Sequence, residues 1–247
     1  MYLHLVELRG KINFHDELRR FFDKKIRPKL NAESGCRFSC IGKAIDTINE
    51  FMTFILWEDT TAAQAFETEG RFAELLAMFE PYMADSQELR TQVNEKLQVE
   101  NVPVPEKPVV TGYRVIIASD PSLTGFSISD AMHVRIVTAV LDPEHREEMV
   151  RFYSSTVIPT LGSVTGFKYA FLFENPANMN SVISLTAWTS GEEADAYEQS
   201  GLFQRLLDEN AGSFSELYRW KLGLSEGLGS RITTSDDPSV RSYDILP

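Results

Sequence analysis

The sequence is poor in cysteine and in positive charge. Only two of its 247 residues are cysteines, Cys36 and Cys40, and two are too few for a disulfide framework. Their spacing of four also differs from the spacing of common zinc and redox sites, so we interpret them as small apolar residues on one strand face. The formal net charge of −12 argues against nucleic acid or an anionic membrane as the main partner.

Several functional signatures are also missing. No apolar run reaches the length of a membrane span, and the N-terminal MYLHLVELRGK has neither a basic leader nor a cleavage site, so we expect a cytoplasmic protein. No Gly-rich phosphate loop follows a strand, and no GxSxG elbow is present. No His/Glu pair has the helical spacing of metal ligands, so the sequence predicts no metal site.

An internal repeat organises the chain. Trp57 in FILWEDTTAAQAFETEGRFAELL matches Trp188 in LTAWTSGEEADAYEQSGLFQRLL, at an offset of 131 residues. The same offset holds without a gap for the following pairs: Arg20 and Arg151, Phe21 and Phe152, Pro28 and Pro159, Gly35 and Gly166, Gly70 and Gly201, Phe72 and Phe203. Two segments that keep register this long indicate a tandem duplication.

Each repeat shows the same order of patterns. A short apolar strand (LHLVEL in the first repeat) precedes an amphipathic segment with Leu18, Phe22 and Ile26 on one helical face. Two strands follow, CRFSCI and FMTFILW, then a second helix, which in the second repeat opens with a capping box at Ser190 and Glu193. We expect closing strands near 89–97 and 214–222. The order β-α-β-β-α-β predicts an α+β fold of two ferredoxin-like repeats.

The boundaries follow from this repeat. We expect a first repeat at 1–100, a linker at 101–130, a second repeat at 131–223 and a C-terminal tail at 224–247. The linker contains NVPVPEKPVV, which is typical of an extended spacer, and then YRVIIAS, which could add a strand. We expect the tail to be mobile or wrapped over the surface.

A split-βαβ unit covers only one face of its sheet with helices. On the third strand we expect the apolar set Met52, Phe54 and Leu56 to meet the helices, and the mixed set that includes Thr53 and Trp57 to face away. The second repeat has Ser184, Thr186 and Trp188 in the mixed set. Packing of the two bare sheet faces against each other would give an α/β barrel within one chain. A pocket would then lie in the barrel or between sheet and helices, lined by the mixed set.

These features resemble the antibiotic-biosynthesis-monooxygenase-like members of the dimeric α/β barrel superfamily. The resemblance rests on the element order, the third strand ending in Trp57 or Trp188, Phe66 or Tyr197 on the next helix, and the closing Gly-x-Phe-x-x-Leu-Leu run. It implies cofactor-free oxygenation of an electron-rich aromatic substrate such as a quinol or an anthrone, hence no cofactor. Haem-degrading relatives need a histidine where this chain has Glu67 and Glu198, so a haem ligand is missing.

Candidate site residues lie on the strands that carry the tryptophans. His4 could accept a proton, and Arg135, its equivalent at the offset of 131, could hold an oxyanion; His133 lies two residues before it. Alternatively, the histidine bonds to the backbone and the arginine sits in an ordinary ion pair. The predicted substrate contacts are Trp57, Trp188, Thr53, Ser184, Thr186 and Tyr169. The tryptophans could equally be plain core residues.

Three functions stay open at this stage. The first is a cofactor-independent monooxygenase that acts on a small hydrophobic or aromatic molecule. The second is a non-catalytic ligand-binding or stress-response protein that uses the same pockets. An isomerase or decarboxylase is the third, because a fold does not fix a reaction. Two such chains could also pair into a homodimer.

Overall fold

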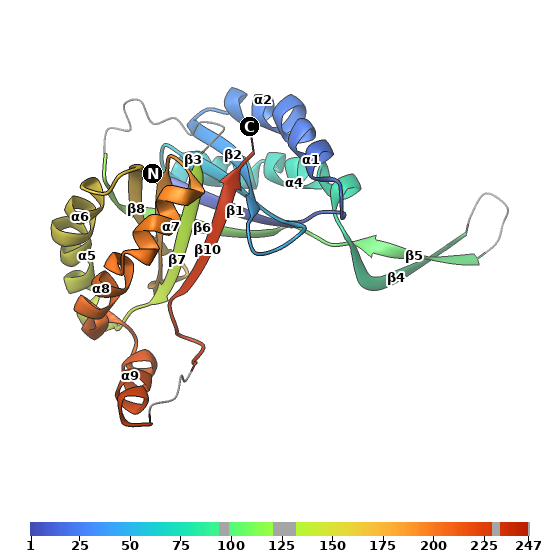
Figure 1. Ribbon diagram of the computed structural model, residues 1–247. Coiled ribbons are helices and arrows are strands. Elements are labelled where there is room, and N and C mark those ends of the chain that lie inside the picture. The colour runs from blue at the N-terminus through green and yellow to red at the C-terminus, as the bar shows by residue number, and fades with distance from the viewer. Residues whose placement is uncertain (94–98, 121–131, 229–232, 247) are drawn as a thin grey trace. The chain divides into compact units, whose positions relative to one another are not determined.

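The chain divides into two compact units, which Figure 1 shows in a computed structural model. Unit 1 comprises Met1–Thr111 together with Leu246, and unit 2 comprises Gly112–Ile245. Across the described part of the chain, no helix combines the length and the apolar character that crossing a membrane requires. The structure describes residues 1–93, 99–120, 132–228 and 233–246.

Unit 1 contains the first repeat. In chain order its elements are β1 (Tyr2–Arg9), α1 (His15–Phe21), α2 (Arg27–Ala32), β2 (Cys36–Ala44), β3 (Glu50–Trp57), α3 (Thr60–Thr68), α4 (Arg71–Ala77), β4 (Asp85–Val93) and β5 (Val99–Pro105). Strands β1, β3 and β2 pair antiparallel in that order, with His4 opposite Ile55. Strands β4 and β5 form a separate two-stranded sheet.

Unit 2 contains the second repeat. Its elements are β6 (Val109–Ala118), which begins at the boundary, then β7 (His133–Val140), α5 (Arg146–Phe152), α6 (Ile158–Gly162), β8 (Phe167–Asn175), β9 (Asn178–Trp188), α7 (Gly191–Gln199), α8 (Leu202–Glu209), α9 (Glu216–Leu228) and β10 (Ser239–Ile245). The sheet order is β10-β7-β9-β8-β6. Within it, β10-β7-β9-β8 has the strand arrangement of the predicted ferredoxin-like unit. Helices α5 to α8 lie together on one side of strand β7 (Figure 1).

The first helix of each repeat changes its winding at the same place. A π-helical turn at Phe22–Ile26 joins α1 to α2, and one at Tyr153–Val157 joins α5 to α6. Two residues beyond each turn comes the proline of the repeat. Proline has no N–H to donate and its ring displaces the carbonyl four residues earlier, so an unbroken α-helix cannot pass through it. The wider π-helical turn accommodates the proline and lets the helix continue.

Glycine is required at the turn before the second strand of each repeat. Gly35 and Gly166 have φ values of +81° and +80°, a backbone conformation that disfavours other residues. A Cβ atom at Gly35 would lie 2.5 Å from the Cβ of Ala62, and one at Gly166 would lie 2.5 Å from the Cβ of Glu193. The turn therefore packs directly on the second helix. The predicted cap of that helix is present, because Ser190 accepts a hydrogen bond from the backbone N–H of Glu193 at 3.4 Å.

The prediction of which strand face meets the helices was wrong. Trp57 and Ile55 pack with the helices of unit 1, as does Val6 of the first strand, whereas the purely apolar set with Phe54 lies on the opposite face and is also buried. The reason is electrostatic. The mixed face carries His4 or Arg135, and a helix brings a glutamate to each of them, whereas the apolar face needs no polar partner.

The expected closing strands were also misplaced. In unit 1, β4 starts at Asp85 but pairs with β5, so part of the supposed spacer is a strand of a separate ribbon. In unit 2, the segment predicted as a strand at 214–222 contributes one bridge, Leu141 to Phe214, and then enters α9. The strand that closes the sheet is β10, which pairs with β7 from within the supposed tail. The strand suggested for YRVIIAS is present as β6, and most of DPSLTGFSISD lies outside the described residues.

Candidate functional site

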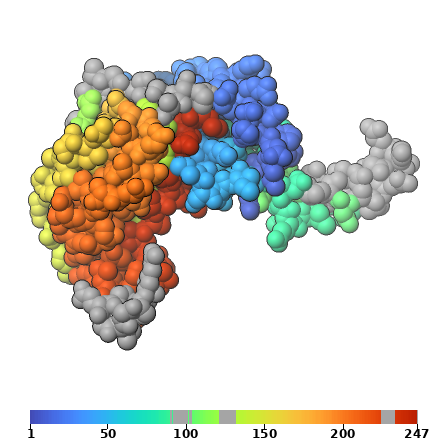
Figure 2. Space-filling model, in the orientation of Figure 1, coloured from blue at the N-terminus to red at the C-terminus, as the bar shows by residue number. Residues whose placement is uncertain are grey.

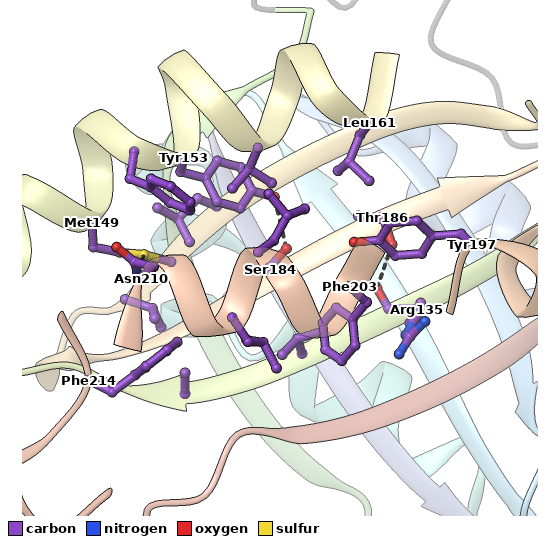
Figure 3. Close-up of a pocket in the computed structure, with 18 residues that line it drawn as sticks. Arg135, Met149, Tyr153, Leu161, Ser184, Thr186, Tyr197, Phe203, Asn210 and Phe214 are labelled. Carbon is purple, nitrogen blue, oxygen red and sulfur yellow. Dashed lines mark hydrogen bonds between the residues drawn. The ribbon is translucent and has the colours of Figure 1, made fainter. Parts of the chain in front are cut away.

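A cavity of about 70 Å³ lies in unit 2 between the sheet and its helices (Figure 3). Its floor comes from alternate residues of two paired strands: Arg135, Val137 and Ala139 of β7 and Val182, Ser184 and Thr186 of β9. Side chains of a strand alternate between faces, so these six share the face toward the helices. The pocket is thus lined by residues of the mixed set, and of the two places considered for it, the barrel and the space between sheet and helices, it occupies the second.

The roof of the cavity comes from the two helical layers. Met149, Tyr153, Val157 and Leu161 recur every four residues along α5, the π-helical turn and α6, so they share one face. Tyr197 of α7 and Phe203 of α8 complete the roof near Arg135. Figure 2 shows these helices, coloured yellow to orange, covering unit 2 on the side in view.

Arg135 is a buried cation at one end of the cavity. Arg135 is 2% exposed, and its guanidinium carbon lies 4.4 Å from the ring centre of Phe203 and 5.9 Å from that of Tyr197. Nη2 lies 2.9 Å from Oε2 of Glu198. That contact is not aligned as a hydrogen bond, and both Nε and Nη2 lack a hydrogen-bond partner. Burial lowers the pKa of the Arg135 guanidinium and Glu198 opposes this, but an arginine keeps its charge in proteins.

A neutral hydroxyl pair lies along the middle of the cavity. The Tyr153 hydroxyl lies 2.8 Å from Oγ of Ser184 and donates to the carbonyl oxygen of Phe171 at 3.0 Å. Burial raises the pKa of the Tyr153 phenol, so the group stays protonated. Burial likewise raises the pKa of Tyr197, to about 12. Neither tyrosine is therefore a base at neutral pH.

An amide marks the other end. Asn210 is 6% exposed; its Oδ1 accepts a hydrogen bond from Ser213 at 3.0 Å, and its Nδ2 donates to the sulfur of Met149 at 2.7 Å. A thioether sulfur is a weak acceptor. Figure 3 shows Asn210 and Arg135 at opposite ends of the cavity.

At the matching place in unit 1, larger buried side chains lie between the sheet and the helices. At the offset of 131, the smaller cavity residues of unit 2 have larger counterparts: Leu8 for Ala139, Phe51 for Val182, Ile26 for Val157 and Ile55 for Thr186. All four larger side chains are at most 3% exposed and belong to one hydrophobic cluster. The two repeats therefore share a backbone pattern but differ in what occupies the space between sheet and helices.

His4 of unit 1 lies in a buried chain of hydrogen bonds. Nε1 of Trp57 donates to Nδ1 of His4 at 3.0 Å, and Nε2 of His4 lies 2.6 Å from Oε1 of Glu67. An indole N–H can only donate, so Nδ1 must be the acceptor and Nε2 carries the hydrogen. Burial lowers the pKa of His4 although Glu67 opposes this, which agrees with a neutral ring. Both nitrogens are thus engaged, and neither is free to take a proton from a ligand.

The structure separates the predicted site residues into two groups. Of the nine, three line the cavity: Arg135, Ser184 and Thr186. Others of unit 2 do not line it: Trp188 donates to Thr186 and stacks on Tyr197, His133 pairs with Asp244 at 3.0 Å, and Tyr169 is half-buried on β8. In unit 1, His4, Trp57 and Thr53 are fully buried within its core.

Sequence reasoning missed the residues that approach the strands from the helices. Tyr153, Phe203 and Asn210 line the cavity, and Glu198 contacts Arg135. The repeat did carry a signal for one of them. Glu67 and Glu198 are equivalent at the offset of 131, as are the buried His4 and Arg135 that they pair with. Both repeats therefore pair a helix glutamate with a polar residue of the first strand.

Most of the residues that line this cavity fall in a segment that is similar to a known family. Residues 132–209 match the family model for antibiotic biosynthesis monooxygenase. No curated protein sequence matches the chain. Within the described ranges, no three His, Cys, Asp or Glu side chains come together as metal ligands would.

Solved structures extend the likeness to the full length. A candidate monooxygenase from Fusobacterium nucleatum subsp. nucleatum has a TM-score of 0.66 at 9% identity and covers 100% of this chain and 92% of its own. One from Lactobacillus acidophilus has a TM-score of 0.64 at 11% identity, with 99% and 93% covered. An anthrone oxidase-like protein has a TM-score of 0.53 at 14% identity, with 100% and 92% covered. These likenesses show the fold alone and confirm the predicted class, an α+β chain of two ferredoxin-like repeats with the pseudo-dimeric α/β barrel fold.

Proposed function

We propose that the cavity of unit 2 is the site of a cofactor-independent monooxygenase that oxidises a small, electron-rich aromatic of the quinol or anthrone type. The observation that supports this most directly is a buried guanidinium with two donors that lack hydrogen bonds, at the end of a mostly apolar cavity, in the segment that matches the monooxygenase family model. A desolvated cation in such a place favours a ligand that carries or develops a negative charge.

The chemistry asks for one proton transfer and dioxygen. A quinol loses the proton of a phenol O–H, and an anthrone loses the proton of an acidic C–H. The anion, delocalised between oxygen and carbon, forms a C–O bond with dioxygen at a ring carbon to give a peroxide. Loss of water from the peroxide leaves a carbonyl, so that a quinol and O₂ become a hydroxyquinone and H₂O, and the CH₂ group of an anthrone and O₂ become C=O and H₂O. The protein has to stabilise the anion and keep bulk water away from it.

Each role has a residue in unit 2. Arg135 would hold the oxyanion through Nε and Nη2, while the rings of Tyr197 and Phe203 lie against its guanidinium. Glu198 is the carboxylate in contact with Arg135, and its side chain is 55% exposed. It would accept the substrate's proton and release it to solvent. The apolar walls exclude water from the reacting carbon.

The size of the cavity adds a constraint on the substrate. At about 70 Å³ it is smaller than the ~150 Å³ cavity that accommodates benzene in an engineered protein. A single ring therefore needs only small movements of the roof side chains, whereas three fused rings need a larger opening. We expect single-ring quinols to be better substrates than anthrones.

A second candidate is a ligand-binding protein without turnover. It is favoured by the residues that line the cavity, which include no carboxylate and no imidazole within the described part of the chain. On this view Arg135 binds an anionic ligand and Glu198 only balances its charge. The two functions differ in whether oxygen is consumed after the ligand binds.

Oxygen uptake with a single-ring hydroquinone, and separately with anthrone, tests the proposal. We expect uptake above the uncatalysed rate with the unaltered protein, and loss of this excess in Arg135→Ala. A second variant, Ala139→Leu/Val182→Phe, fills the cavity with the residues that unit 1 carries at these positions. It should abolish uptake without unfolding the chain. Uptake that survives both variants would place the reaction elsewhere, and binding without uptake would select the second candidate.

A further inference from the structure

The two ends of the unit 2 cavity present hydrogen-bond donors of different kinds. At one end Nε and Nη2 of Arg135 lack a hydrogen-bond partner, although Nη2 is in an ion pair with Glu198, and at the other end Nδ2 of Asn210 donates to a thioether sulfur. Arg135 pairs with Thr186 in the sheet and Ala139 pairs with Val182, so the floor runs four residues along β7, or about 13 Å. Asn210 belongs to the far end, because its partner Ser213 bonds through its backbone to Asp142, just after β7.

Between these ends the described lining is apolar apart from hydroxyl groups, and those of Tyr153, Ser184 and Thr186 have partners. The Tyr153 hydroxyl contacts Ser184, and Thr186 accepts from the indole of Trp188. A ligand that filled this slot would leave two sets of unsatisfied or weakly satisfied donors at its ends. An unsatisfied buried donor costs free energy, so the ligand that fits best has an acceptor for each.

We infer that the natural ligand carries an anionic oxygen at one end and a neutral carbonyl oxygen at the opposite end of an aromatic ring. This inference deepens the proposed function and rests on it, because it assigns the ligand of the same cavity. The anionic oxygen binds Arg135. The carbonyl accepts from Nδ2 of Asn210 and takes the place of the Met149 sulfur as its partner. The ionised hydroxyquinone that oxygenation of a quinol yields has this arrangement.

The equivalent positions of unit 1 support a role of Asn210 in ligand binding. Asn210 corresponds to Phe79 and Met149 to Leu18, both within the core cluster of unit 1. The repeat whose cavity is filled has therefore no amide at this place, and the repeat with a cavity has one. A polar group that served packing alone would be expected in both.

Two probes of matched size separate the acceptor from the charge: 4-acetylbenzoate and 4-isopropylbenzoate. Both are fully ionised at neutral pH, and they differ in the carbonyl. We expect the unaltered protein to bind the acetyl compound about three- to tenfold more tightly, as the worth of one neutral hydrogen bond implies. Calorimetric titration measures the ratio of the two dissociation constants.

Two variants then assign the preference to Asn210. Asn210→Leu should bring the ratio to about one, and Met149→Leu, which installs the unit 1 residue, should keep or increase it because the amide loses its competing partner. A ratio near one in the unaltered protein, or a ratio unchanged in Asn210→Leu, overturns the inference. If both benzoates still bind in that case, the proposed anion site at Arg135 stands. Failure of both probes to bind overturns the two together.

Discussion

Filling the cavity of unit 2 should stabilise the protein and abolish ligand binding at the same time. The double variant Ala139→Leu/Val182→Phe replaces two floor residues by their counterparts Leu8 and Phe51 of unit 1. Those counterparts are 2% and 3% exposed and pack in a continuous cluster. The backbone pattern of the repeat therefore accepts this pair of side chains.

The expected gain follows from the volume removed. Residual cavities in protein cores cost about 24 cal/mol per Å³, so a cavity of about 70 Å³ corresponds to about 1.7 kcal/mol. Overpacking would subtract from this gain, since extra methylene groups in a full core cost about 1–3 kcal/mol. We expect a net increase in the free energy of unfolding of about 1 kcal/mol. The reverse change in unit 1, Leu8→Ala, should lower it by about 3–5 kcal/mol.

Urea denaturation measures both variants, and titration with 4-isopropylbenzoate measures binding. The expected pattern has opposite signs: the filled variant gains stability and loses affinity, and Leu8→Ala loses stability and keeps affinity. A filled variant that still binds the benzoate with unchanged affinity would refute the assignment of the site. A filled variant destabilised as strongly as Leu8→Ala would refute the claim that the two repeats differ in packing volume.

Three further outcomes are expected. Arg135→Ala should weaken benzoate binding about tenfold to a hundredfold, the range for hydrogen bonds to charged groups. Arg135→Lys should retain part of the affinity, because lysine keeps the charge but not the fork of donors. Calorimetric titration measures both dissociation constants. The free energy of unfolding should be constant above pH 7 and should decrease as the pH falls below about 6.5, by at most ~1.4 kcal/mol per pH unit. The reason is that folding lowers the pKa of His4, so the unfolded chain binds a proton at His4 more tightly than the folded chain does. His4→Gln should flatten that fall between pH 5 and 8 in urea titrations, where an unaltered slope would exclude His4 as its source. Tyr153→Phe, which matches Phe22 of unit 1, should cost about 1 kcal/mol through the lost hydrogen bonds, as measured by denaturation.

The repeat made most of the architecture predictable. An offset of 131 residues fixed the correspondence of strands and helices, and the structure follows it down to the π-helical turns Phe22–Ile26 and Tyr153–Val157. The same offset also relates the glycines with positive φ, such as Gly70 and Gly201. Local signals of this kind are repeated in the sequence, and two readings of one pattern correct each other.

The orientation of the strands could not be read from the same pattern. Hydrophobic alternation identifies two faces but not which of them meets the helices, and here both are buried. The mixed face was expected to lie away from the helices because the other face is purely apolar. The polar partners of the mixed face are distant in sequence and gave no signal. Glu67 lies 63 residues from His4, and Glu198 lies the same distance from Arg135. Such pairs appear only once the helices have been placed over the sheet.

The closing strands were missed for a related reason. A last strand is defined by its partner, and Ser239–Ile245 is recognised as β10 because it pairs with β7. It follows helix α9, whose first part the sequence pattern had not distinguished from a strand. Segment 89–97 overlaps a strand as expected, yet β4 pairs with β5 and not with the sheet of its repeat. Propensity indicates that a segment is extended, and tertiary pairing decides to which sheet it belongs.

The asymmetry of the two repeats argues that function resides in the second. A duplicated unit starts with two identical cores, and a core loses stability whenever a buried side chain is shortened. Unit 2 has Ala139 and Val182 where unit 1 has Leu8 and Phe51, and it has the polar Tyr153 and Asn210 where unit 1 has two phenylalanines. Every one of these differences favours the packing of unit 1. A cavity with unpartnered donors persists against that cost only if something compensates for it, and a ligand that fills the space and satisfies Arg135 does so.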